Sequence, residues 1–248
     1  MNLANAKRLI GTLPSNALVL DVGGGASPFP RADWVVDAVP YEGRGTGSDG
    51  NAHTALGVTQ RYAPETWVQV DLCARNPWPF SDKAFDFAVC SHLLEDVRDP
   101  IWVCSELRRV SKAGYIETPS RFVEQSTGVE HPRHAGFYHH RWLVEVESGG
   151  LVFRLKPHSI HSFNDAVVAR LGSAQAINPK YATCVLEWQD SFDSAERLEF
   201  NEDAVTEELC GFAERARAIP DLVVPVPMPM GRYVKRRIYY WRLSRGLR

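Results

Sequence analysis

The most constraining feature of this chain is an apolar run that ends in an acidic residue and three glycines. Residues 17–22 are almost entirely apolar and lead directly into Asp21-Val22-Gly23-Gly24-Gly25. A continuous apolar run is typical of a strand buried on both faces of a sheet. Glycines directly after such a strand let the backbone turn tightly and approach a ligand without interference from a Cβ atom. The segment therefore predicts a nucleotide-type binding loop.

Similar apolar runs follow at regular spacing, separated by helical or loop patterns. We predict strands over residues 34–39, 67–72, 85–91 and 115–118, and helices over residues 3–10 and 100–110. Strands that alternate with helices at this spacing indicate an α/β fold with a mostly parallel, doubly wound sheet.

The second half is less regular. We predict a hairpin of residues 142–146 and 151–155, a strand over 183–188, a helix over 203–218 and an extended proline-rich stretch at 224–230. We interpret residues 1–248 as one domain, in which 17–120 form the core, 121–165 a histidine-rich region and 200–248 a C-terminal helix and basic tail.

Composition excludes some classes of protein. The net charge of −2 argues against a generic polyanion binder. No stretch approaches the roughly 18 apolar residues that span a membrane, and the first residues lack a secretory pattern. The five cysteines are scattered without a Cys-x-x-Cys pair, which favours reduced thiols and a cytoplasmic protein.

The glycine loop is compatible with more than one kind of nucleotide ligand. The NAD fingerprint Gly-x-Gly-x-x-Gly, counted from Gly23, places its last position on Pro28, where proline fits poorly. Asp37 ends the second apolar run, where an ionised carboxylate can accept from both hydroxyls of a ribose.

The later segments carry a resemblance to a known family. Asp71-Leu72 is followed by Pro77-Trp78-Pro79-Phe80 and then by FDFAVCSHLLEDVRDPIWVCSELRRVSKAGYIETPS at residues 85–120. In this order the segments resemble the class I S-adenosylmethionine (SAM)-dependent methyltransferases, Rossmann-like proteins of the methyltransferase type 11 kind with a seven-stranded-type sheet. The resemblance covers roughly residues 17–120.

The resemblance implies a role for each matching residue. The loop would hold the methionine part of SAM and Asp37 its ribose, while the adenine and the sulfonium would lie at the ends of the next strands. The cofactor-binding residues implied are Asp21, Gly23, Gly24, Gly25, Asp37, Asp71, Leu72, Ser91 and His92.

The chain departs from the family pattern at two places. Pro28 and Pro30 lie in the short segment between the glycine loop and the second strand, which predicts a first helix of about one turn, with Ser27 as its cap and Pro28 at its first position. The family's Leu-Glu-His is Leu94-Glu95-Asp96 here.

Six of the eight histidines fall between residues 131 and 161. Histidine suits proton transfer near neutral pH, so we consider His134, His139 and His140 as a catalytic general base. Two alternatives remain open: a polar loop whose histidines stack on Phe137, Tyr138 and Trp142, and a divalent cation held by Glu130 with nearby histidines or Asp96. Three residues after the fifth strand, Glu117, Ser120 and Arg121, are further candidates for acceptor contacts.

The acceptor is the least constrained part of the interpretation. Residues 91–94 lack the Asn/Asp-Pro-Pro-Tyr/Phe of amino methyltransferases that act on nucleic acids, so a nucleic-acid partner is not expected. Histidines and aromatic residues suit a small polar acceptor, and we favour O-methylation of a sugar or glycan hydroxyl. The alternatives are a phenolic or carboxylate natural product and a non-catalytic binding module.

Two peripheral segments have their own expectations. The glycine-rich loop 41–64, with Arg44, Asp49 and His53, is a candidate lid. The tail 231–248 carries seven basic residues and no acidic one, and it either packs on the domain or docks on an anionic membrane surface.

Overall fold

The computed structural model describes residues 1–25, 27–43, 56, 58–161, 163–172 and 174–226. The chain divides into two compact units. Unit 1 contains residues 1–118, 146–152 and 185–195, and unit 2 contains residues 119–145, 153–184 and 196–248. Whether the whole chain acts as a single domain stays a prediction.

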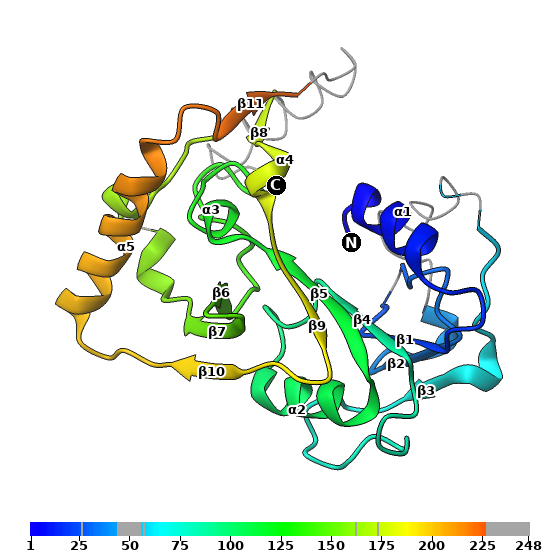
Figure 1. Cartoon of the computed structure of the whole chain (residues 1–248). Helices are drawn as coiled ribbons and strands as arrows, with labels where there is room; N and C mark the ends of the chain where they lie inside the picture. Colours follow the sequence, from blue (N-terminus) through cyan, green and yellow to red (C-terminus); the bar gives the residue numbers. More distant parts are fainter. Residues whose placement is uncertain (26, 44–55, 57, 162, 173, 227–248) are drawn as a thin grey trace. The chain divides into compact units, whose positions relative to one another are not determined.

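The main sheet has six strands in the order β3-β2-β1-β4-β5-β9 (Figure 1). Its strands are β1 (Val19–Val22), β2 (Trp34–Asp37), β3 (Trp67–Gln69), β4 (Phe87–Ser91), β5 (Ala113–Pro119) and β9 (Thr183–Gln189). The first five are joined by parallel pairs, β3 with β2, β2 with β1, β1 with β4 and β4 with β5. The predicted α/β class with a mostly parallel, doubly wound sheet is therefore confirmed.

The register brings the carboxyl ends of these strands to one edge of the sheet. Val22 of β1 lies beside Cys90 of β4, and Ser91 lies beside Glu117 of β5. Open α/β sheets bind ligands outside the carboxyl ends of their strands, where the order reverses. That point is β1 and its neighbours here, directly before the glycine loop.

Two helices flank these strands along the chain. Helix α1 (Leu3–Thr12) starts at Asn2, whose side chain accepts from the Ala4 N–H. Helix α2 (Pro100–Val110) starts at Asp99, which accepts from the Trp102 N–H, and proline at the first position needs no donor there. Both helices confirm the sequence predictions.

The predicted one-turn helix between β1 and β2 is wrong. The described residues of this segment contain only turns, in which the Ser27 N–H donates to Gly24 O and the Ala32 N–H donates to Phe29 O. Pro28 and Pro30 explain the difference, because each removes a backbone donor and restricts the preceding residue against helical angles.

The count of seven strands is also not met in the described residues. The predicted hairpin forms as β6 (Trp142–Glu147) and β7 (Gly150–Leu155), joined by Ser148 and Gly149 at φ of 50° and 80°. Positive φ at both positions is the signature of a tight two-residue turn. The hairpin joins β10 (Ser194–Arg197) in a separate sheet of order β10-β7-β6, so only β9 is added to the main sheet.

Unit 2 holds short elements around helix α5 (Glu202–Arg217), which confirms the predicted C-terminal helix. The others are α3 (Arg121–Glu124), α4 (Pro179–Ala182), and an antiparallel pair of β8 (Gln175–Ile177) and β11 (Val223–Pro225). Two apolar clusters include α5 residues, one around Leu209 and one around Ala213 and Ala216. Among the described residues, no helix is both long enough and apolar enough to cross a membrane.

Candidate functional site

The glycine loop is held close to its neighbours. Gly23 has φ of +71°, and a Cβ atom there would lie 2.7 Å from the side chain of Leu93. A Cβ atom on Gly24 would lie 2.7 Å from Oδ2 of Asp21. Such separations are well inside van der Waals contact. Gly23 therefore requires glycine for its backbone conformation, and Gly24 requires glycine for space.

Asp21 is buried beneath this loop. Its Oδ2 accepts a hydrogen bond from the Phe29 N–H at 2.6 Å. Burial, together with the nearby charge of Asp37, raises the pKa of Asp21 to about 7, although the Phe29 bond acts in the opposite direction. A carboxyl group with this pKa gains free energy when a cationic ligand binds beside it.

Asp37, at the end of β2, ties the loop to the sheet. Its Oδ2 accepts from the Gly25 N–H at 2.6 Å, and its Oδ1 accepts from the Val39 N–H at 2.7 Å. The carboxylate is buried. Each oxygen has a second lone pair, so the predicted bond to a ribose is compatible with these contacts.

A small pocket of about 30 Å³ lies over these residues. Its lining is Met1, Asp21, Gly23, Gly24, Ser27, Phe29, Val89 and Ser91. Ligand pockets usually have roughly 300–1,000 Å³, so the described space holds only part of a nucleoside ligand. The residues present nevertheless fit the methionine end of SAM, because they combine a tight glycine loop with a buried acidic side chain that a cationic ligand would stabilise.

Asp71 and Leu72 differ in exposure. Asp71 lies two residues past the end of β3, is largely exposed, and accepts from the Cys73 N–H at 2.9 Å and from Arg98 at 3.1 Å. Leu72 is buried. The adenine roles that the resemblance implies for this pair stay a prediction.

His92 follows β4 in the left-handed region, with φ of 54°. Its Nε2 lies 3.3 Å from Oε1 of Glu117, and its Nδ1 lies 3.4 Å from Oε1 of Glu95. Burial lowers the pKa of His92, but the two carboxylates outweigh it and raise the pKa to about 9. His92 is therefore a cation between two buried acids at neutral pH.

Glu117, considered from the sequence as an acceptor contact, is fully buried in a polar network. It accepts from the Asn2 N–H at 2.6 Å, from Asn5 Nδ2 at 2.9 Å and from the hydroxyl of Tyr115. Burial alone would raise the pKa of Glu117, but these donors and His92 hold it at about 2. Asn5 was missed from the sequence, because it lies 112 positions from Glu117.

The histidines of unit 2 have distinct partners. His131 Nδ1 accepts from the Arg133 N–H, and His161 Nδ1 accepts from the Ala135 N–H, each at 3.1 Å. Burial and nearby positive charges lower the pKa of both, to about 4 for His161. These two imidazoles are therefore neutral and serve the backbone.

The three candidate bases differ in burial. His134 is exposed and lies 4.2 Å from the ring of His131, in a stacked arrangement. His139 is also exposed, with its ring 5.3 Å from Tyr138. His140 is buried, and its ring lies 4.6 Å from Phe137. The base role of these three stays a prediction. The predicted ring contacts with Phe137 and Tyr138 are present, but the His140 ring is tilted against Phe137 and the His139 ring meets Tyr138 edge-on.

A buried charged trio surrounds His140. Its Nδ1 lies 2.8 Å from Oε1 of Glu124, and Lys156 Nζ donates to Oε2 of Glu124 at 2.6 Å. Burial tends to raise the pKa of Glu124, but His140 and Lys156 lower it below its usual value. Sequence analysis missed Glu124 and Lys156, since neither lies at a motif position.

Three other candidates have partners within unit 2, and their predicted roles stay predictions. Arg121 is buried and pairs with both carboxylate oxygens of Glu208 and with Glu145 at 3.1 Å. Ser120 caps α3 and donates to Tyr181 O. Glu130, considered as a metal ligand, accepts from the Tyr138 N–H at 3.3 Å.

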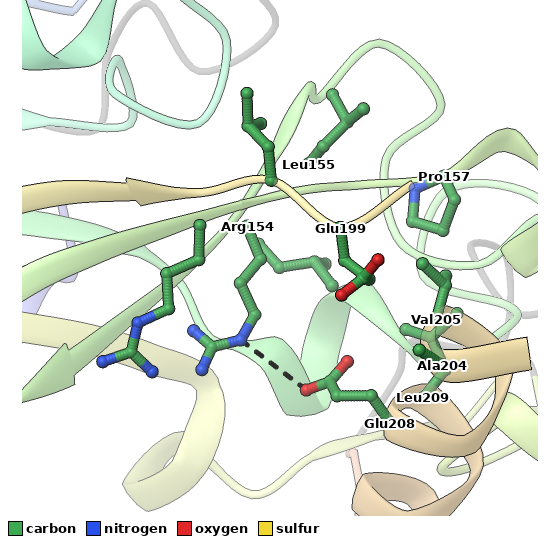
Figure 2. A pocket seen from close by; sticks show the side chains of 11 residues that line it. Arg154, Leu155, Pro157, Glu199, Ala204, Val205, Glu208 and Leu209 are labelled. Atoms are coloured by element: carbon green, nitrogen blue, oxygen red, sulfur yellow. Dashed lines mark ion pairs between the residues drawn. The ribbon is translucent and has the colours of Figure 1, made fainter. Parts of the chain in front are cut away.

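A larger pocket of about 290 Å³ lies within unit 2 (Figure 2). Leu155, Val205, Leu209 and other apolar side chains line it, and Nε of Arg154 lies 3.7 Å from Oε1 of Glu208. This pocket is larger than the one at the glycine loop, and no sequence motif points to it.

Two segments named from the sequence fall partly outside the description. Arg44, Asp49 and His53 of the candidate lid and the basic tail 231–248 lie outside the described residues.

Comparison with known proteins adds the family. Residues 20–116 match the family described as methyltransferase domain, which is less than half of the chain. The match covers β1 to β5, hence the glycine loop, Asp37, Asp71, His92 and α2. A search of curated protein sequences gave no match.

Solved structures show partial likeness. An S-adenosylmethionine-dependent methyltransferase from Mesorhizobium loti is 18% identical, with 62% of this chain and 67% of that chain covered and a TM-score of 0.32. An arsenic(III) S-adenosylmethionine methyltransferase from Chlamydomonas reinhardtii is 17% identical, with 46% and 49% covered and a TM-score of 0.33. The chain spans about half the length of the first structures it matches.

The family match covers most of the parallel strands β1 to β5 and the loop at their switch point, which is less than half of the chain. The matched family implies SAM as the cofactor. Residues 20–116 are therefore similar to a methyltransferase domain, and they fold as a doubly wound α/β sheet.

Proposed function

We propose that this protein binds SAM at the glycine loop and transfers its methyl group to a small polar acceptor. The observation that carries the proposal is the buried Asp21, with a pKa of about 7, under a loop in which Gly23 and Gly24 leave no room for a side chain. The methionine end of SAM carries a sulfonium and an ammonium, so an acidic site stabilises it.

The same charges argue against a dinucleotide. A pyrophosphate bound at this loop would lie beside Asp21 and Asp37, and like charges this close destabilise binding. NAD sites instead offer the N-terminus of a helix to the pyrophosphate, and the described residues between β1 and β2 form turns only. The proposed ligand is therefore SAM.

For the acceptor we propose a hydroxyl of a sugar or glycan. When bound, SAM supplies an electrophilic methyl group on a sulfonium. An aliphatic hydroxyl needs a base to take its proton as its oxygen attacks, and His134, His139 and His140 are the candidates for that base. A phenolic or carboxylate natural product is the nearest alternative acceptor.

Isothermal titration calorimetry tests the donor. We expect SAM and S-adenosylhomocysteine to bind, NAD to show no heat, and Asp37→Ala to weaken SAM binding strongly. Binding of NAD without SAM, or undiminished SAM binding by Asp37→Ala, contradicts the proposal. Asp203→Ala, an exposed carboxylate in the first turn of α5, is the matched control.

Transfer of a radiolabelled methyl group from SAM to a panel of mono- and oligosaccharides and phenols tests the acceptor. Activity that a chelator abolishes assigns the divalent cation, which the family match does not support. SAM binding with no transfer to any hydroxyl favours the non-catalytic module. A cytoplasmic location is part of the proposal, supported by five free cysteines.

A further inference from the structure

Helix α1 and its cap residue fix the carboxylate of Glu117 at the end of β5. The Asn2 N–H donates to Oε1 at 2.6 Å, Asn5 Nδ2 donates to Oε2 at 2.9 Å, and the Tyr115 hydroxyl is a third donor. Burial raises the pKa of Glu117, but His92 and these donors outweigh it and hold the pKa at about 2. Glu117 therefore keeps its negative charge at every pH near neutrality.

The ring that faces this carboxylate is that of His92, which directly follows β4. Its Nε2 lies 3.3 Å from Glu117 Oε1 and its Nδ1 lies 3.4 Å from Glu95 Oε1, while the amino group of Met1 lies 4.0 Å from Glu117 Oε1. Burial and this amino group lower the pKa of His92, but the two carboxylates raise it to about 9. Ser91, the residue before His92, lines the glycine-loop pocket, so an imidazolium adjoins the proposed cofactor site.

A cation next to this pocket would oppose the ligand that the proposed function requires. SAM carries a sulfonium, an ammonium and a carboxylate, so it is a net cation, whereas S-adenosylhomocysteine lacks the sulfonium and is neutral overall. Like charges repel more strongly in a partly buried site than in water, because the effective dielectric constant is lower there. Glu117 supplies the opposite charge at the His92 ring and thereby keeps the site suited to a net cation.

The family match gives a role to neither Glu117 nor Asn5. It covers residues 20–116, so α1 lies before it and Glu117 lies directly after it. Both residues belong to unit 1, together with His92 and the glycine loop.

We propose that Glu117 is a specificity-determining residue of the cofactor site, which neutralises the His92 imidazolium and favours SAM over S-adenosylhomocysteine, and that Asn5 positions it. The inference rests on the proposed function. Loss of the methyl group turns the sulfonium into a neutral thioether, so the spent cofactor no longer benefits from the negative charge of Glu117.

Isothermal titration calorimetry of the full chain with SAM and with S-adenosylhomocysteine at pH 6 tests the proposal. Glu117→Gln keeps the size of the side chain and removes one negative charge, so the Kd for SAM should rise about tenfold and the Kd for S-adenosylhomocysteine no more than about twofold. Because both proteins are compared at one pH, the titration of Asp21 contributes equally to both. Equal losses for the two ligands would show a structural role alone and would overturn the proposal.

His92→Asn should give the opposite result, because it removes the positive charge, and asparagine tolerates the left-handed φ of 54°. The ratio of the Kd for S-adenosylhomocysteine to the Kd for SAM should rise about tenfold. An unchanged or lower ratio overturns the proposal even if Glu117→Gln does not fold. Glu65→Gln removes an exposed acid before β3, at the opposite edge of the sheet, and as the matched control should leave the ratio unchanged.

Asn5→Ala tests the positioning role. Without the amide donor the Glu117 side chain can turn away from His92, so the pKa of His92, followed by NMR of its ring protons, should fall below the wild-type value. The SAM preference should fall as in Glu117→Gln, by a smaller factor. Lys7→Ala, at an exposed position of α1, is the control and should change neither. A folded Asn5→Ala protein with unchanged His92 titration and unchanged preference would refute the positioning role.

The wild type separates this inference from the proposed function. A wild type that binds neither SAM nor S-adenosylhomocysteine refutes the proposed function. Normal SAM binding, with a preference that neither Glu117→Gln nor His92→Asn changes, refutes only the role of Glu117.

Discussion

The glycine-loop site and the histidine-rich region each bury a carboxylate, but they treat its charge in opposite ways. Asp21 lies beside another acid and is buried, and its pKa rises to about 7 although the backbone N–H groups of Phe29 and Val22 and the N-terminal ammonium act in the opposite direction. Glu124 lies between an ammonium and an imidazole, and its pKa falls. At the first site the positive charge nearby does not offset burial, so a cationic ligand would stabilise the Asp21 carboxylate, whereas side chains of the protein already stabilise Glu124 at the second site.

The largest expected effect comes from removing the ammonium beside Glu124. Lys156→Met leaves Glu124 buried without its ammonium, and breaking a buried pair from one side costs about 3–5 kcal/mol of unfolding free energy. Urea denaturation measures it. Lys180→Met, at an exposed lysine of α4, should leave the free energy of unfolding almost unchanged. Equal losses of unfolding free energy in the two variants would show that the buried pair of Lys156 and Glu124 stabilises the fold no more than an exposed lysine does.

Asp21→Asn should raise the free energy of unfolding, whereas Lys156→Met lowers it. In the wild type the folded chain keeps the Asp21 proton up to about pH 7, whereas the unfolded chain loses it near 3.8. Stability from this group therefore falls as pH rises from about 4 to about 7 and stays low above that. Removing the charge should recover up to about 2–4 kcal/mol at pH 8.

Thermal denaturation from acid to mildly basic pH measures this effect, and the variant should show a flatter profile between about pH 4 and 7. If Asp21→Asn is less stable than the wild type at pH 8, neighbouring groups already stabilise the wild-type Asp21 carboxylate. Asp21 would then resemble Glu124.

Two glycine substitutions compare the tightly packed glycine loop with an open position in α1, and their expected effects on stability are smaller. Gly24→Ala places a Cβ atom 2.7 Å from Asp21 Oδ2 and 3.0 Å from Pro28, which should cost about 1–3 kcal/mol and abolish SAM binding. Gly11→Ala in α1 meets nothing within 4 Å and should stabilise by about 0.5–1 kcal/mol. Denaturant midpoints and SAM titration of both variants provide the check.

The smallest effect concerns His92. Its folded pKa of about 9 exceeds the ordinary 6.5, so its contribution is fully present below pH 6.5 and is lost as pH rises to about 9. The ring is 42% exposed, so solvent screening leaves about 1 kcal/mol. Denaturation at pH 6 and pH 9 measures this pH dependence of stability, and His92→Gln should abolish it.

Much of the fold was readable from local patterns. The glycines after β1, the start of α2 at Pro100 and the turn at Ser148-Gly149 each act through their own backbone chemistry, so sequence alone located them. The helix after the glycine loop was mispredicted, because family analogy outweighed Pro28 and Pro30.

The sites were readable only in part. Asp37 was found because a strand end and a motif coincide there. The bond from Lys156 to Glu124 spans 32 positions, and that from Asn5 to Glu117 spans 112, so no spacing rule reveals either. Partners of this kind are set by tertiary packing.

The pH dependence of SAM binding, measured by calorimetry, tests the central claim most directly. If Asp21 awaits a cation, SAM binding should release close to one proton near pH 6, and the Kd should rise up to tenfold per pH unit below about 7. Asp21→Asn should abolish both effects. A SAM affinity that is independent of pH in the wild type, or a site that binds NAD in place of SAM, would contradict the account.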